Sequence, residues 1–135
     1  MEKERRERGV AAYASQLGLS EAEAEGWFVE RFGPRFAEEA FLAAGGAWQA
    51  DSLSLRDRSL IVLAVLAAQG GVESRLRPHV RWALEHGATA AELDALACLL
   101  AVYVGFPRAS VALEAIREEL GLTGAPGGGA EGEPR

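Results

Sequence analysis

Cysteine, histidine and long apolar stretches are scarce in this chain of 135 residues. It has one cysteine, Cys98, and two histidines, so an internal disulfide is impossible and the usual soft metal ligands are few. The longest apolar stretches, 60–68 and 95–104, have about half of the ~20 residues that a membrane-spanning helix needs. The charged segment 1–8 is not followed by the apolar stretch of a secretory signal. We therefore expect a cytoplasmic protein with no membrane partner.

Basic residues are also in the minority: 14 Lys and Arg against 20 Asp and Glu give a formal net charge of −6. This charge repels phosphate backbones, so nucleic acid is not expected as a partner. Hydrophobic residues make up 49% of the chain, which is typical of a folded protein. The length fits one domain, which we place at residues 1–121. Glycine and proline make up half of residues 122–135, so we predict a flexible tail there.

Helix start and stop signals divide the chain into about six helices. Ser20 and Thr89 each precede a glutamate by three residues, the capping-box spacing that satisfies free amides at a helix start. Glycines end most of the periodic apolar segments. The predicted helices cover about 21–32, 34–44, 55–69, 72–86, 90–104 and 106–121, and residues 1–17 predict a peripheral helix whose first turns fray. Because no strand-like alternation of useful length occurs, the predicted fold class is all-α.

Pro78 lies inside the segment 72–86. Because proline removes a backbone hydrogen bond, we predict that the helix proper begins just before Pro78 or kinks there. Glu73 and Arg77 are four residues apart, which predicts an ordinary ion pair on the helix surface.

Two of the predicted helices carry more apolar surface than one core can cover. In helix 55–69, Leu60 and Leu63 lie on one face, and Val62 and Val65 lie on a second. A helix with two apolar faces needs two partners, so we predict a homo-oligomer. Helix 90–104 is almost wholly apolar and is predicted to be central, with the Cys98 thiol buried as a small hydrophobe.

His79 is the first candidate for chemistry. It lies at the edge of the inward stripe of its helix, one turn after Leu76, with Arg75 and Trp82 on its outer flank. The alternative is a core histidine held by a hydrogen bond. His86, directly before a glycine, is expected to complement the dipole at the helix end. Since the two histidines are seven residues apart and lack neighbouring ligands, no metal site is predicted.

Arg58 is the second candidate, because it stands in line with apolar residues of helix 55–69. A guanidinium against an apolar wall is a suitable clamp for a carboxylate. An ion pair between subunits is the alternative, and the sequence does not decide between the two. Phosphate-binding loops and nucleophile-elbow motifs are missing from the sequence, so those enzyme classes find no support.

Several short motifs together resemble the carboxymuconolactone decarboxylase family, over about residues 27–119. They are Arg56-Asp57-Arg58-Ser59-Leu60, Arg75-Leu76, His79-Val80, Ala83-Leu84, Gly87-Ala88-Thr89, Glu92-Leu93 and Tyr103-Val104-Gly105-Phe106-Pro107-Arg108-Ala109. The resemblance implies the helical fold shared with alkyl hydroperoxidase D. It also implies assembly into rings, commonly hexamers built from trimers or dimers.

The family resemblance also implies a chemistry. The peroxidase branch has cysteines at the positions of Val72 and Arg75, so thiol peroxidase activity is not expected here. The decarboxylase branch keeps the histidine and removes carbon dioxide from a carboxylated lactone in aromatic-compound degradation, without metal or organic cofactor. The resemblance then assigns His79 as acid or enolate donor, Arg58 as carboxylate clamp and Tyr103 as supporting donor.

One stretch departs from the family pattern. Ala44 and Ala50 stand where the decarboxylases usually have tryptophan and arginine. With fewer cations, selection for a doubly charged substrate should weaken, and another small carboxylated or carbonyl compound becomes plausible as the ligand. The alternative to a lyase is therefore an oligomeric family scaffold that binds such a ligand without turnover.

Overall fold

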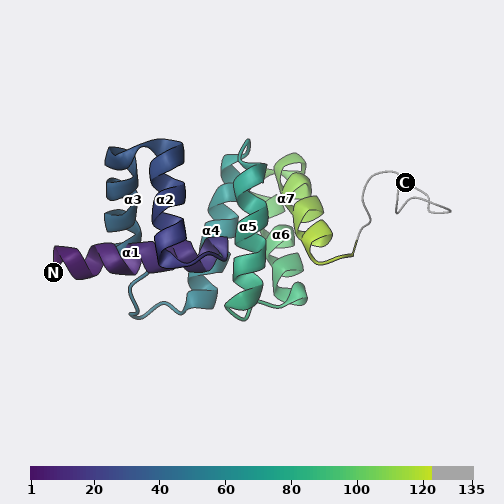
Figure 1. Cartoon of the computed structure of the whole chain (residues 1–135). Helices are drawn as coiled ribbons and strands as arrows, with labels where there is room; N and C mark the ends of the chain where they lie inside the picture. The colour runs from purple at the N-terminus through teal and green to yellow at the C-terminus, as the bar shows by residue number, and fades with distance from the viewer. Residues whose placement is uncertain (123–135) are drawn as a thin grey trace. The chain divides into compact units, whose positions relative to one another are not determined.

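The computed structural model describes residues 1–122 of the chain, and these residues form helices and no strands. The seven helices are α1 (Glu2–Leu17), α2 (Glu21–Phe32), α3 (Pro34–Ala47), α4 (Leu55–Gln69), α5 (Glu73–Glu85), α6 (Ala90–Val104) and α7 (Phe106–Glu119), shown in Figure 1. The predicted all-α class is confirmed. Residues 1–122 contain seven helices, whereas the predicted count is about six. The additional helix is the charged N-terminal segment, which is helical from Glu2 onward.

Local capping decides where two of the helices begin. The amide of Glu23 donates to Oγ of Ser20 at 3.1 Å, and the amide of Ser20 donates to Oε1 of Glu23 at 2.9 Å. Thr89 and Glu92 make the same reciprocal pair before α6. Both capping boxes are confirmed, because each satisfies amides of a first helical turn by contacts three residues apart.

The predicted helix start just before Pro78 is wrong, and the alternative of a kink at Pro78 stays a prediction. Helix α5 begins at Glu73, more than one turn before the proline, and includes Pro78 in its interior. The missing amide of Pro78 forgoes one hydrogen bond near the helix start. The burial of Leu76, Val80 and Ala83 on the inward face outweighs that loss, since each large apolar side chain contributes roughly 1.5–3 kcal/mol.

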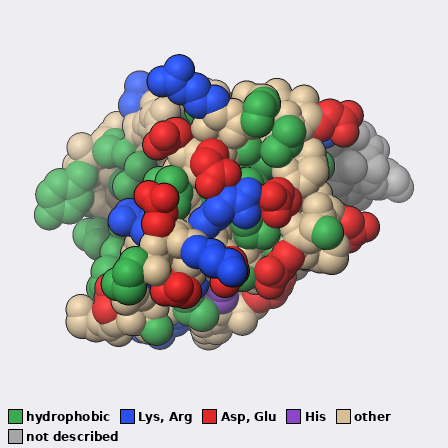
Figure 2. All heavy atoms as spheres, turned by 60° about the vertical axis from the view of Figure 1, so that its left-hand side comes forward, with side chains coloured by type: hydrophobic (Ala, Val, Ile, Leu, Met, Phe, Trp, Pro, Cys, Tyr) green, Lys and Arg blue, Asp and Glu red, His purple; other side chains and the backbone are tan. Residues whose placement is uncertain are grey.

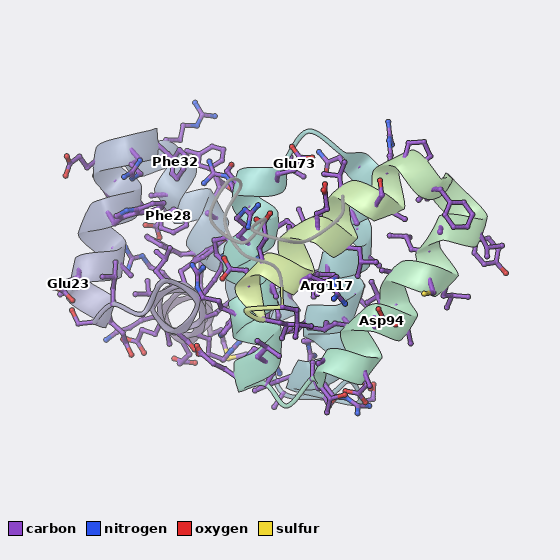
Figure 3. All side chains as sticks on the ribbon, turned by 90° about the vertical axis from the view of Figure 1, so that its right-hand side faces the viewer. Glu23, Phe28, Phe32, Glu73, Asp94 and Arg117 are labelled. Atoms are coloured by element: carbon purple, nitrogen blue, oxygen red, sulfur yellow. The ribbon has the colours of Figure 1, made fainter. Side chains whose placement is uncertain are left out.

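By its contacts the chain divides into two compact units, and the first, Met1–Leu55, contains α1, α2 and α3. Helix α1 crosses the antiparallel pair α2 and α3 in Figure 1. The crossing is close because glycines face backbone: a Cβ on Gly9 would lie 1.7 Å from the carbonyl oxygen of Phe41. The core of this unit is aromatic, with the rings of Phe28 and Phe32, labelled on α2 in Figure 3, 5.5 Å apart.

The second unit, described from Arg56 to Leu122, contains the rest of α4 and all of α5, α6 and α7. Helix α7 packs against both α5 and α6 (Figure 1). The core of this unit contains ten buried residues, which come from these helices and one loop: Leu63, Ala67, Leu76, Val80, Ala83, Ala88, Leu93, Ala112, Ala115 and Ile116. This core determines which face of α5 turns inward, and hence where His79 lies.

Ion pairs link α5 to α7. Nη2 of Arg77 lies 2.6 Å from Glu118, and Nη1 of Arg81 lies 2.9 Å from Glu119. The predicted pair between Glu73 and Arg77 is wrong, because a carboxylate from α7 takes its place. An exposed pair along one helix is worth only a few tenths of a kcal/mol, so a well-placed partner from another helix readily replaces it.

Helix α6 buries one face only. Leu93, Ala97 and Ala101 are buried at four-residue spacing, whereas Cys98 is exposed. The prediction of a buried thiol is therefore wrong, since Cys98 follows the buried stripe by one residue and points about 100° away from it. Leu99, Val102 and Tyr103 also lie on the exposed face of α6. Although α6 is strongly apolar, much of its surface is therefore not covered by the core of the chain.

Charged side chains of both signs are interspersed on the face that Figure 2 shows. No helix within residues 1–122 combines the length and hydrophobicity needed to cross a membrane. The assignment of one domain to residues 1–121 stays a prediction. The predicted tail, 122–135, lies outside the described residues except for Leu122.

Candidate functional site

His79 is half-buried on α5, and its Nδ1 atom is buried. The ring centroid of Trp82 lies 5.9 Å from that of the imidazole. Burial lowers the pKa of His79 below its ordinary value of 6.5, because a charged imidazolium loses hydration in this position. At neutral pH the ring is therefore uncharged, with one nitrogen able to donate a hydrogen bond and the other able to accept one.

Trp82 links His79 to a second histidine. Its side chain is only 3% exposed, and its ring centroid lies 4.7 Å from that of His86. His86 is the C-cap residue of α5, as its predicted place at the helix end suggests, and its Nδ1 lies 2.7 Å from Oγ of Ser59. Ser59 is 1% exposed in α4. We call Ser59, His79, Trp82 and His86 the His79 cluster; it joins α4 to α5.

Arg58 precedes Ser59, and its side chain is 7% exposed. Its backbone position is well defined, because Ser59 is hydrogen-bonded to His86 and Nη1 of Arg56 lies 2.8 Å from Glu92 in the first turn of α6. A guanidinium with little exposure binds a carboxylate more strongly than one in water, because the effective dielectric constant is lower. The two predicted roles of Arg58 are substrate clamp and intersubunit ion pair, and in both the guanidinium binds a carboxylate.

Tyr103 has a different environment from the other two candidates. It lies in the last turn of α6 and is 80% exposed, beside the exposed side chains of Val102 and Phe106. Among the described residues, the structure therefore brings His79 into one cluster, places Arg58 one residue before Ser59 of that cluster, and leaves Tyr103 on the outer surface. Tyr103 can take part in the same site only if a second molecule covers this face.

Sequence reasoning missed Ser59 and the role of Trp82. A usable signal exists: α4 and α5 are joined by the short turn at Gly70 and Gly71, so the first turn of α4 returns to the last turn of α5. A serine near one end and a histidine near the other can then meet. The sequence does not show which rotation of each helix brings the two side chains together.

The residues described, 1–122, include no group of three or more His, Cys, Asp or Glu side chains placed to hold a metal ion. What the site offers is a neutral imidazole, a buried cation and an apolar indole. Such groups donate hydrogen bonds to a developing negative charge and bind a carboxylate.

Two comparisons show which known proteins this chain is similar to. Residues 34–118 match the sequence model of the carboxymuconolactone decarboxylase family. The chain is also 35% identical over 83 residues to 4-carboxymuconolactone decarboxylase of Acinetobacter baylyi, an alignment of 59% of this chain and 61% of that protein. This chain thus spans less than two thirds of the relative's length. Because the family match covers more than half of the chain and includes α4–α6 entire, the protein belongs to the carboxymuconolactone decarboxylase family.

Proposed function

We propose that this protein removes carbon dioxide from a small carboxylated lactone, such as 4-carboxymuconolactone, without a metal or organic cofactor. The similarity to the Acinetobacter decarboxylase carries the proposal, together with the family match over residues 34–118, the range in which the His79 cluster lies. The neutral state of His79 and the burial of Arg58 support it, because both suit an anionic substrate whose charge moves during the reaction.

The reaction breaks the bond between a ring carbon and a carboxylate. The electron pair left on carbon moves into the lactone carbonyl and forms a dienolate, which then takes up a proton at carbon. A neutral imidazole is a weak acid, so the lowered pKa of His79 favours the role of hydrogen-bond donor to the enolate oxygen over the role of proton source. In this scheme water supplies the proton, and Arg58 holds a carboxylate of the substrate.

Self-association is part of the proposal. Leu99, Val102, Tyr103 and Phe106 form an exposed apolar surface that a second copy of the chain would cover. We propose that Tyr103 acts as a supporting donor in the site of that neighbouring copy. A ring of six copies, or of three, is the assembly that the family resemblance implies.

Carbon dioxide release from 4-carboxymuconolactone and related lactones tests the activity. We expect the wild-type protein to release carbon dioxide, and His79→Asn and Arg58→Gln to lower kcat/KM by roughly 100-fold or more, the usual effect of losing one transition-state donor. Arg117→Gln, which changes a cation in the last turn of α7, is the matched control and should keep full activity. Wild-type rates from His79→Asn would refute the site.

Mixed oligomers test the role of Tyr103 separately. If His79→Asn and Tyr103→Phe are each inactive because they damage opposite sides of one interface, some sites of a co-refolded mixture contain both native residues. Activity should then return in the mixture. Additive residual rates without recovery would show that Tyr103 does not act across an interface.

The second candidate function is binding without turnover. The buried Nδ1 atom and the indole beside it also suit a histidine that only stabilises the α4–α5 contact. In that case the His79→Asn variant should lose stability, because a buried hydrogen-bonded group contributes about 1–3 kcal/mol. A lowered melting temperature together with an absence of carbon dioxide release from any lactone would favour this second function.

A further inference from the structure

A cavity of about 420 Å³ lies in the second unit, where α4 ends and α5 and α7 begin. Its apolar walls come from three helices: Leu66 of α4, Leu76 of α5 and Val111 of α7. The volume falls in the range of small-molecule sites, and apolar walls with a few polar groups are the usual composition of such sites. His79, Arg58 and Tyr103 are not among the lining residues, so this cavity is separate from the His79 cluster.

A glycine turn positions a cation at this cavity. Gly70 and Gly71 have φ values of 71° and 74°, a left-handed conformation that favours glycine. A Cβ on Gly70 would approach Nε of Arg108 to 3.3 Å, so the absence of a side chain lets the guanidinium lie close against the turn. Nη1 of Arg108 donates to the carbonyl oxygen of Ala68 at the end of α4. This contact uses one of five N–H groups, and Arg108 is an exposed residue of the cavity lining, so further donors are available there.

The charges around the cavity favour one anionic group. Arg108 carries a full positive charge, and the N-terminal ends of α5 and α7 add partial positive charge. Glu73 opposes them, but its carboxylate accepts a hydrogen bond from the amide of Gly71 at 3.1 Å. Positive charge thus lies on the α7 side, beside an apolar wall, and a second anionic group would meet Glu73.

We propose that this cavity binds a small molecule that has one carboxylate and an apolar body. Arg108 holds the carboxylate through its planar set of donors, and the apolar body packs between Leu66, Leu76 and Val111. The site does not depend on the proposed decarboxylase activity, because it shares no residue with the His79 cluster.

Three matched probes test the proposal on the full-length protein: 3-phenylpropionate, 3-phenylpropan-1-ol and 3-phenylpropylammonium. Titrations followed by amide chemical shifts at pH 7 should give shifts at Gly70, Gly71 and Val111. We expect the carboxylate to bind roughly tenfold or more tightly than the alcohol, the effect of one charge-assisted contact. The ammonium should bind more weakly than the alcohol.

Variants identify the residues responsible. Arg108→Gln should bind the carboxylate and the alcohol equally. Arg117 lies farther along α7 and is labelled in Figure 3, and Arg117→Gln should keep the preference for the carboxylate over the alcohol. Glu73→Gln preserves an acceptor for the Gly71 amide and removes a negative charge, so it should bind the carboxylate several-fold more tightly. Val111→Trp should abolish binding of all probes by filling the space.

Several results would overturn the proposal. Equal affinity for the carboxylate and the alcohol in the wild-type protein would remove the role of Arg108, and no shift with any probe would remove the site. Loss of 3-phenylpropionate binding in His79→Asn, with the fold intact, would show that the cavity belongs to the His79 cluster. Failure to release carbon dioxide bears only on the proposed lyase, because the binding titration has no catalytic readout.

Discussion

The substitution Gly9→Ala should destabilise the protein through one helix crossing. The added Cβ would lie 1.7 Å from the carbonyl oxygen of Phe41, whereas ordinary contact begins at 3.4 Å, so α1 and α3 would have to separate by about 1.7 Å. Backbone atoms cannot move aside as side-chain ends do. Overpacking of this kind costs about 1–3 kcal/mol or more, and the lost contacts along the crossing place the cost near 3 kcal/mol.

The higher helix propensity of alanine returns about 0.5–1 kcal/mol, which leaves a net loss of about 2 kcal/mol. Urea unfolding followed by far-ultraviolet circular dichroism measures this difference. Gly26→Ala is the matched control, because a Cβ at Gly26 in the interior of α2 would meet nothing within 4 Å. It should stabilise the protein by about 0.5–1 kcal/mol. Equal stability of Gly9→Ala and the wild type would refute the close crossing.

Three further predictions concern titration, assembly and thiol chemistry. A pH titration by NMR should give His79 a pKa below 6.5. Because folding favours the neutral ring, the contribution of His79 to stability is complete above pH 6.5 and declines as the pH falls toward the pKa of the folded state. His79→Asn should lack this pH dependence of stability. Light scattering should give a multiple of 14.3 kDa, and we expect a hexamer, which Val102→Glu should dissociate. A monodisperse wild-type monomer at micromolar concentration would contradict the predicted assembly. The protein should reduce no organic hydroperoxide with a dithiol donor, and turnover that disappears in Cys98→Ser would reverse that conclusion.

The sequence by itself determined the helices, because their start and stop signals act over three or four residues. Ser20 pairs with Glu23 and Thr89 with Glu92 through contacts that any chain with this spacing can form. Pro34, the first residue of α3, and Pro107, the second residue of α7, likewise favour a helix start wherever those helices later pack. The motifs of the family could be found in the same way, since they are also local in the sequence.

Only the tertiary structure decided which side chains meet. Cys98 faces outward, Arg77 pairs with Glu118, and α5 begins five residues before Pro78, each against the prediction from sequence. The contact between Ser59 and His86 spans 27 residues, and the approach of Arg108 to Gly70 spans 38. Such contacts depend on the rotation of each helix about its axis, which is set by how buried side chains from several helices fill one core. A periodic pattern within one helix leaves that rotation undetermined when the helix is apolar on more than one face.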